Sequence, residues 1–196
     1  STNLYINKEY AYSLFMQFKY DEAIPLYEKL IAQGFDNFES NFILGLCYEN
    51  QPDNEKALKH YQKAVQFKSD NATCLFHLAL VEKAFNMDSL SMAHFNQSLE
   101  VSLPKGRALR TYKWLADLHF QHHRYTDAAR DFELCTLYDE EDNPLNYYNA
   151  AQMFIASKNK LKAKLYLQMF LANANRLEDK KEAAQLISKA KEQLKQ

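Results

Sequence analysis

The chain has 196 residues, of which 47% are hydrophobic, 25% charged and 14% aromatic, and these proportions exclude a disordered or low-complexity protein. It contains only three glycines and four prolines, well below the usual share of about 7% and about 5%. So few turn residues argue against a many-stranded sheet, and they leave no glycine-rich loop to hold a phosphate. The composition therefore predicts an all-α protein.

The 24 Lys and Arg residues nearly balance the 25 Asp and Glu residues, and the two signs are interspersed along the chain. This distribution gives little attraction to a phosphate backbone or an anionic membrane, so we expect no nucleic-acid partner. No apolar run approaches the ~18 residues of a membrane span, and we expect no membrane insertion. A cytoplasmic location is favoured, while export or a periplasmic location stays open if an upstream signal was removed.

Three cysteines, Cys47, Cys74 and Cys135, occur without CxxC spacing. Because the number of cysteines is odd and none of them is in a CxxC pair, the sequence predicts neither a disulfide framework nor a thiolate zinc site. We expect buried free thiols, which favours a reducing compartment.

An internal repeat organises the chain. The small residues Ala23, Ala57 and Ser91 recur at intervals of 34, and Ala128 follows after 37. Four residues after each lies an aromatic one: Tyr27, Tyr61, Phe95 and Phe132. A second series of small residues precedes the first by twelve: Ala11, Gly45, Ala79 and Ala116, with Ala150 as a fifth member. The three extra residues fall near 103–107, so the period predicts paired helices that approach closely at the small residues.

This pattern resembles the tetratricopeptide repeat, a helix–turn–helix unit of 34 residues. The resemblance implies an all-α, right-handed superhelical solenoid and a single domain over residues 1–196. Its repeats would cover 4–37, 38–71, 72–108, 109–142 and 143–177. Glu82, His119 and Met153 depart from the family's usual tyrosine, which Tyr48 matches.

Residues 178–195 form the expected end of the stack. Asp179 and Glu182 resemble a capping box, and a one-sided apolar stripe follows it: Ala183, Leu186, Ile187, Ala190 and Leu194. We interpret this segment as a helix that covers the last repeat; the rival interpretation is a partner-binding helix.

One cluster looks chemical. His119 lies three and four residues before His122 and His123, a spacing that zinc-binding pairs use. No glutamate lies between them in a zinc-protease pattern, so we expect packing for His119 and solvent exposure for the other two. No serine or cysteine sits in a glycine-flanked elbow. We predict no enzymatic activity, no metal and no cofactor.

The best-known recognition mode of the resembled family grips the C-terminal carboxylate of heat-shock chaperones through lysine, asparagine and arginine. Lys8 matches the first lysine. The other four positions hold different residues: Tyr12, Ile43, Thr73 and His77. Bidentate carboxylate recognition would lack its donors, so we expect no heat-shock-chaperone clamp.

The resemblance implies a non-catalytic protein-interaction module whose first helices line a concave groove. Aligned on the repeat, apolar and aromatic side chains predominate there, as in interaction hot spots. The predicted peptide-binding residues are Tyr5, Lys8, Tyr12, Phe15, Phe42, Leu46, Phe76, Leu80, Arg110, Lys113, Trp114, Phe120, Tyr147 and Phe154. They would take an extended or helical segment of an unidentified protein partner, as in an adaptor, an assembly factor or a chaperone-like scaffold.

Three alternatives stay open. Some of these side chains would pack between repeats instead of lining a groove. In the second alternative, the same surface binds another copy of the chain and makes a homo-oligomeric scaffold. In the third, the chain is a regulatory domain of a larger signalling or enzymatic protein.

Overall fold

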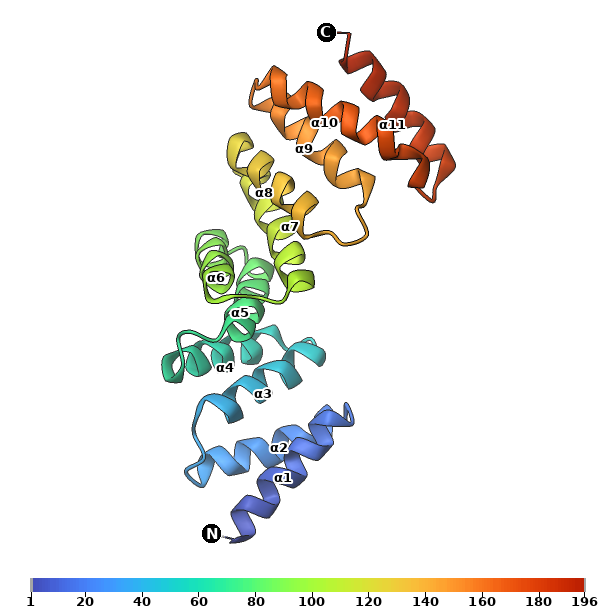
Figure 1. Ribbon diagram of the computed structural model, residues 1–196. Coiled ribbons are helices and arrows are strands. Elements are labelled where there is room, and N and C mark those ends of the chain that lie inside the picture. Colours follow the sequence, from blue (N-terminus) through green and yellow to red (C-terminus); the bar gives the residue numbers. More distant parts are fainter. Residues whose placement is uncertain (1, 196) are drawn as a thin grey trace. The chain divides into compact units, whose positions relative to one another are not determined.

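The computed structural model describes residues 2–195, with side chains from residue 4 onward, and every regular element in that range is helical. The chain divides into two compact units, the first ending at Leu103 and the second beginning at Pro104 (Figure 1). Unit 1 holds α1 (Thr2–Met16), α2 (Tyr20–Ala32), α3 (Phe38–Asn50), α4 (Asn54–Phe67), α5 (Ala72–Ala84) and α6 (Asp88–Val101). Unit 2 holds α7 (Lys105–Gln121), α8 (Tyr125–Tyr138), α9 (Pro144–Ala156), α10 (Lys160–Asn173), the short 3₁₀ helix η1 (Ala174–Arg176) and α11 (Lys180–Gln193).

The expected helical hairpins are confirmed: α1–α2, α3–α4, α5–α6, α7–α8 and α9–α10 each pack as a pair. The single-domain assignment over residues 1–196 stays a prediction.

Asparagine and aspartate begin several of these helices, which is one reason so little glycine is needed. The side-chain oxygen of Asn37 accepts a hydrogen bond from the Ser40 N–H at 3.0 Å, and that of Asn71 accepts one from the Cys74 N–H at 2.9 Å. The hairpin turns use left-handed backbone without glycine, at Phe18, Asn86 and His123. Such residues cost about 1–2 kcal/mol each, which the packing of the two helices offsets.

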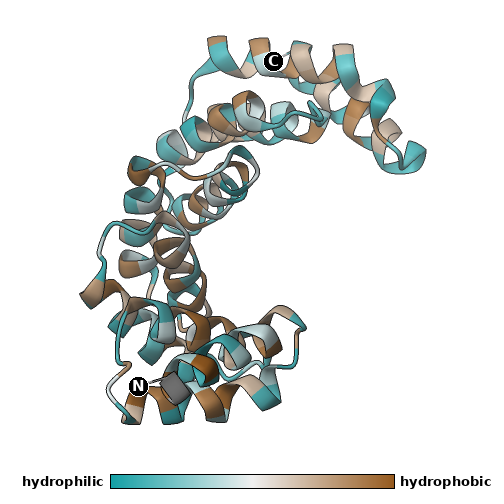
Figure 2. Ribbon diagram, turned by 60° about the horizontal axis from the view of Figure 1, so that its bottom comes forward, coloured by the Kyte–Doolittle hydropathy of each residue, from teal (hydrophilic) through white to brown (hydrophobic). Residues whose placement is uncertain are grey.

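The small residues of the repeat lie where the paired helices touch. Ala11, Ala23, Ala57 and Ala79 are fully buried, and the Ser91 hydroxyl donates to the Ala79 carbonyl across the α5–α6 contact at 2.8 Å. In both units, apolar and polar residues alternate in bands along the helices (Figure 2), as expected for helices that bury one face.

Gly45 is the one glycine in such a contact. A Cβ at this position would lie 2.5 Å from two carbon atoms of the Tyr61 ring. The Tyr61 ring lies against α3 at this point, and its hydroxyl donates to the Glu49 carboxylate, one turn further along α3, at 2.5 Å.

Helix α11 packs on the last hairpin of unit 2, and its role as a cap of the stack stays a prediction. Leu186, Ile187 and Leu194 pack against the buried cluster of α9 and α10. Asp179 caps the helix, its carboxylate accepting from the backbone N–H groups of Lys181 and Glu182 at 2.9 Å each. None of the helices described in residues 2–195 is both long enough and apolar enough to cross a membrane.

Candidate functional site

The first helices of the repeats in unit 1 make contacts along one side, which we call the inner wall of unit 1 (α1, α3 and α5). Lys8 on α1 forms an ion pair with Glu39 on α3 at 2.6 Å. The Phe42 ring on α3 lies 6.3 Å from the His77 ring on α5, and His77 Nδ1 also donates to the Glu49 carboxylate at 2.9 Å. Three successive repeats therefore present adjoining side chains on this wall.

Most of the predicted groove residues of unit 1 retain exposed surface on the inner wall. Tyr5 and Tyr12 are 62% and 41% exposed, one above the other on α1. The remaining five are half-buried: Lys8, Phe15, Phe42, Leu46 and Leu80. The inner wall of unit 1 thus combines large exposed phenol rings with half-buried side chains, most of which are apolar.

Two predicted groove residues are core residues instead, which corrects the sequence interpretation. Phe76 is 1% exposed, and its ring lies 6.0 Å from that of Phe95 on the paired helix α6. Phe154 is 5% exposed and packs 5.3 Å from the Tyr166 ring on α10. Both rings point between the two helices of their own hairpin, so neither presents a face to a ligand.

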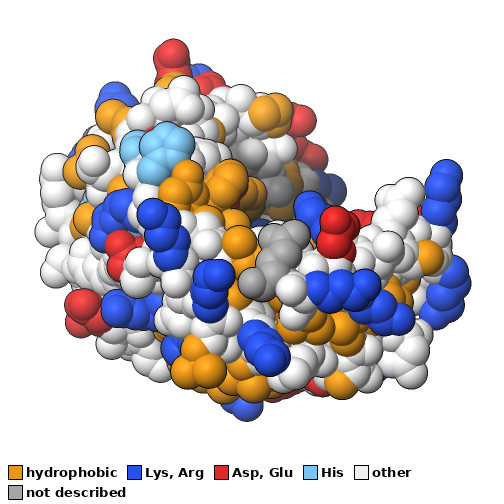
Figure 3. Space-filling view, turned by 90° about the horizontal axis from the view of Figure 1, so that it is seen from above, with side chains coloured by type: hydrophobic (Ala, Val, Ile, Leu, Met, Phe, Trp, Pro, Cys, Tyr) orange, Lys and Arg blue, Asp and Glu red, His pale blue; other side chains and the backbone are white. Residues whose placement is uncertain are grey.

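The predicted residues of unit 2 are more polar and more dispersed. Arg110, Lys113 and Phe120 are exposed, whereas Trp114 and Tyr147 are half-buried. The Tyr147 hydroxyl donates to the Asp142 carboxylate. On the face drawn in Figure 3, Lys and Arg side chains are interspersed with apolar and acidic ones.

Sequence reasoning missed a hydrogen-bonded group beneath the inner wall. One oxygen of Glu49 accepts from both the Tyr61 hydroxyl and His77 Nδ1. Burial, with the Glu49 charge beside it, raises the pKa of the Tyr61 phenol, so it stays a donor at neutral pH. The only sequence signal was the glycine at position 45, where the other repeats have alanine.

Tyr27 holds the position of Tyr61 one repeat earlier, yet its buried hydroxyl has no hydrogen-bond partner among the described residues. The repeat places Phe15 where Glu49 would be. We expect Tyr27→Phe to raise the free energy of unfolding by about 1 kcal/mol, because an unpaired buried hydroxyl is removed. Tyr61→Phe should lower it by about 1–3 kcal/mol, since it leaves the Glu49 carboxylate without its phenol donor. Urea unfolding of both variants measures this; a loss of stability in Tyr27→Phe would show that its hydroxyl is in fact paired.

His119 is a packing residue, whereas His122 and His123 are exposed, as the sequence predicted. His119 is buried, and its Nδ1 donates to the Asp131 carboxylate at 2.6 Å, while His122 and His123 are exposed at the hairpin turn. Burial raises the pKa of the Asp131 carboxyl, an effect that the hydrogen bond from His119 partly opposes. Residues 4–195 bring together no set of three His, Cys, Asp or Glu side chains that would hold a metal ion.

Two of the three departures from the family's tyrosine, Glu82 and His119, are accompanied by a partner residue twelve positions later. His94 donates to buried Glu82 at 2.7 Å between α5 and α6, and His119 pairs with Asp131 between α7 and α8. In the first pair the acid is on the first helix of the hairpin and the imidazole on the second, and in the second pair the order is reversed. Tyr48 instead stacks on its counterpart His60, with ring centroids 5.7 Å apart. These contacts join the two helices of each hairpin.

The cysteines are buried free thiols, as expected. Burial raises the pKa of Cys47, Cys74 and Cys135 to about 12, so the reactive thiolate is scarce at neutral pH.

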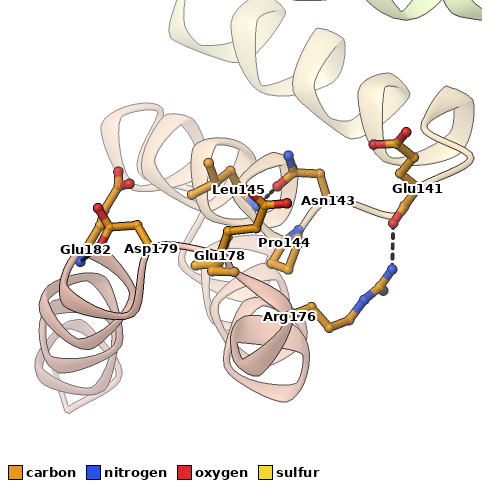
Figure 4. A pocket seen from close by; sticks show the side chains of 9 residues that line it. Glu141, Asn143, Pro144, Leu145, Arg176, Glu178, Asp179 and Glu182 are labelled. Carbon is orange, nitrogen blue, oxygen red and sulfur yellow. Dashed lines mark hydrogen bonds between the residues drawn. The ribbon is translucent and has the colours of Figure 1, made fainter.

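A cavity of about 370 Å³ lies in unit 2, between the α8–α9 loop and the segment from η1 to the start of α11 (Figure 4). Its lining carries the carboxylates of Glu141, Glu178, Asp179 and Glu182. Arg176 lies at one edge of it (Figure 4), donating to the Glu141 carbonyl at 2.5 Å and pairing with Asp142 at 2.7 Å. None of the predicted groove residues lines this cavity, and Arg176 ties the loop to the end of the last hairpin.

Comparison with known proteins agrees with this architecture. Residues 16–87 match the family model of the anaphase-promoting complex, cyclosome, subunit 3. A curated relative, DnaJ homolog subfamily C member 3 of Gallus gallus, is 24% identical over 111 residues, which is 57% of this chain and 22% of that protein. The chain therefore spans about a fifth of the length of this relative.

Solved structures cover nearly the whole chain. YrrB, described as a TPR protein with an unusual peptide-binding site, has a TM-score of 0.73 at 16% identity over 92% of this chain and 89% of its own. MamA has a TM-score of 0.72 at 14% identity, over 89% of this chain and 95% of its own. The chain has the fold of a tetratricopeptide-repeat solenoid. PilF of Pseudomonas aeruginosa has a similar fold, with a TM-score of 0.66 at 13% identity over 97% of this chain and 86% of its own. Tetratricopeptide repeats typically serve as protein-interaction scaffolds, so the fold supports that general class.

Proposed function

We propose that the protein is a non-catalytic interaction module that binds an apolar peptide segment of a partner protein on the inner wall of unit 1. The observation that supports this most directly is the exposure of Tyr5 and Tyr12 above half-buried Phe15 and Phe42. Exposed phenol rings lose little conformational entropy on binding and offer both an apolar face and a hydroxyl. The description of YrrB as having a peptide-binding site supports the same class of ligand.

The charges on the wall specify the ligand further. Lys8 and Glu39 neutralise each other across α1 and α3, and Glu49 is engaged by Tyr61 and His77. A terminal carboxylate would therefore find no unpaired cation at Lys8. We infer an internal apolar segment with aromatic or aliphatic side chains, instead of a charged chain end.

The test uses peptides selected from a phage-displayed library on the purified full chain. We expect the selected peptides to be rich in apolar residues, and their affinity to fall at least tenfold in Tyr5→Ser/Tyr12→Ser, since each lost ring removes about 1 kcal/mol or more. Tyr10→Ser is the matched control, because Tyr10 is an equally exposed tyrosine on a different side of the same helix. Thermal midpoints of all variants should stay close to that of the wild type. If the selected peptides bind Tyr5→Ser/Tyr12→Ser as tightly as they bind Tyr10→Ser, the binding surface lies elsewhere.

A further inference from the structure

One helix of unit 2 is apolar at outward-facing positions where the other repeats are not. Leu161 and Leu165 lie one turn apart on α10 and are 82% and 51% exposed. The equivalent positions of the other four second helices are also exposed, and none of them holds a large hydrophobic residue. They are Asp21, Glu55, Ser89 and Thr126 in place of Leu161, and Pro25, Lys59, Ala93 and Arg130 in place of Leu165. The exposure of the two leucines therefore belongs to the position within the repeat, and not to a helix missing at an end of the stack.

The same repeat is basic. Residues 143–177 contain four lysines and one arginine but no aspartate or glutamate, although the whole chain has a net charge of −1. Lys160 and Lys164 accompany the leucines on α10, and Lys158 lies in the turn before it. All three are exposed, and none of them forms an ion pair within residues 4–195. We call these three lysines and the two leucines the outer face of α10.

The folding of unit 2 gives no reason for this composition. Lysines at the start of a helix oppose the partial positive charge of its first turn. The first turns of α2, α4, α6 and α8 all contain acidic residues, whereas that of α10 contains none. A leucine that stays exposed contributes no burial of apolar surface. A ligand that takes up both the leucines and the positive charge would account for both departures.

From this charge and this exposed apolar surface we propose that the outer face of α10 binds an anionic lipid surface. Exposed leucines flanked by lysines are the two features that hold a helix at the interface of a membrane. A partner helix would need a groove to lie in, whereas Leu161 stands clear of its neighbours with 82% of its surface exposed. The nearest acidic group, Glu133 on α8, is already neutralised by Lys162 at 2.9 Å. This site lies in unit 2, so it does not depend on peptide binding at the inner wall of unit 1.

The test is flotation of the purified full chain with lipid vesicles. We expect the chain to float with phosphatidylcholine vesicles that contain about 30% phosphatidylglycerol, and not with phosphatidylcholine alone. Raising the salt to about 0.5 M should release most of it, because the charges are screened. Leu161→Ser/Leu165→Ser and Lys160→Gln/Lys164→Gln should each lower the ratio of bound to free protein at least fivefold.

Matched controls separate this face from the general charge and hydrophobicity of the chain. Lys29→Gln/Lys59→Gln removes the same two charges from exposed positions of α2 and α4, and Leu90→Ser/Val101→Ser removes two exposed apolar side chains from α6. Both should float like the wild type. Thermal midpoints of all four variants should stay close to that of the wild type, since every substituted side chain is exposed.

Three results would overturn the proposal. The first is failure to float with the anionic vesicles. The second is flotation that Leu161→Ser/Leu165→Ser leaves unchanged, which would show adsorption by charge alone. The third is a dimer in sedimentation equilibrium that the same variant dissociates, which would mean that a second copy covers the face. If vesicles are not bound while acidic peptides from the displayed library lose affinity for this variant, a partner protein occupies the face instead.

Discussion

Phe76→Ala should lower the free energy of unfolding by about 3–5 kcal/mol, because it removes a fully buried ring from the contact between α5 and α6. The ring fills the space beside Phe95, and its loss leaves a cavity that neighbouring side chains fill only in part. In a stack of repeats the damage concentrates in one repeat and its immediate neighbours. Urea unfolding followed by circular dichroism measures the loss.

Phe42→Ala is the matched control, since Phe42 is the aromatic residue at the same position one repeat earlier. It is half-buried and lies against Phe38 on the inner wall, with ring centroids 5.5 Å apart. We expect it to cost less than half as much as Phe76→Ala. Equal losses in the two variants would contradict the distinction between core and wall.

Gly45→Ala should lower the free energy of unfolding by about 2–4 kcal/mol, although alanine is the better helix former. The added Cβ would lie 2.5 Å from the Tyr61 ring, so the ring or the helix must shift. A shifted ring weakens the hydrogen bond from Tyr61 to Glu49, which also binds His77. These losses exceed the gain of about 1 kcal/mol in helix propensity.

Two controls isolate this cause. Gly106→Ala lies near the start of α7, where an added Cβ meets nothing within 4 Å, so it should be neutral or slightly stabilising. In a Tyr61→Leu background, Gly45→Ala should cost far less than in the wild type, because the obstructing ring and its hydrogen bond are gone. If Gly45→Ala costs the same in both backgrounds, the Tyr61 ring is not what requires glycine at position 45. Unfolding in urea gives all four values.

Much of the fold follows from local sequence. Small residues at intervals of 34 locate the contacts between paired helices, and the extra residues near 103–107 coincide with the division between the two units. Asp179 as a helix cap and the apolar stripe of α11 were likewise readable, since caps and stripes depend only on neighbours in sequence. The buried state of the cysteines follows from their positions in the repeat.

Tertiary structure alone decided which side chains face outward. One residue turns a helix by about 100°, so an alignment accurate to one residue cannot separate Phe76 and Phe154 in the core from Tyr5 and Tyr12 on the wall. The contacts of Glu49 with Tyr61 and His77 join helices of two repeats and depend on how those helices pack. The repeat period sets which residues are equivalent, but only the packing of neighbouring helices determines which equivalent positions are covered, and so which remain available to a partner.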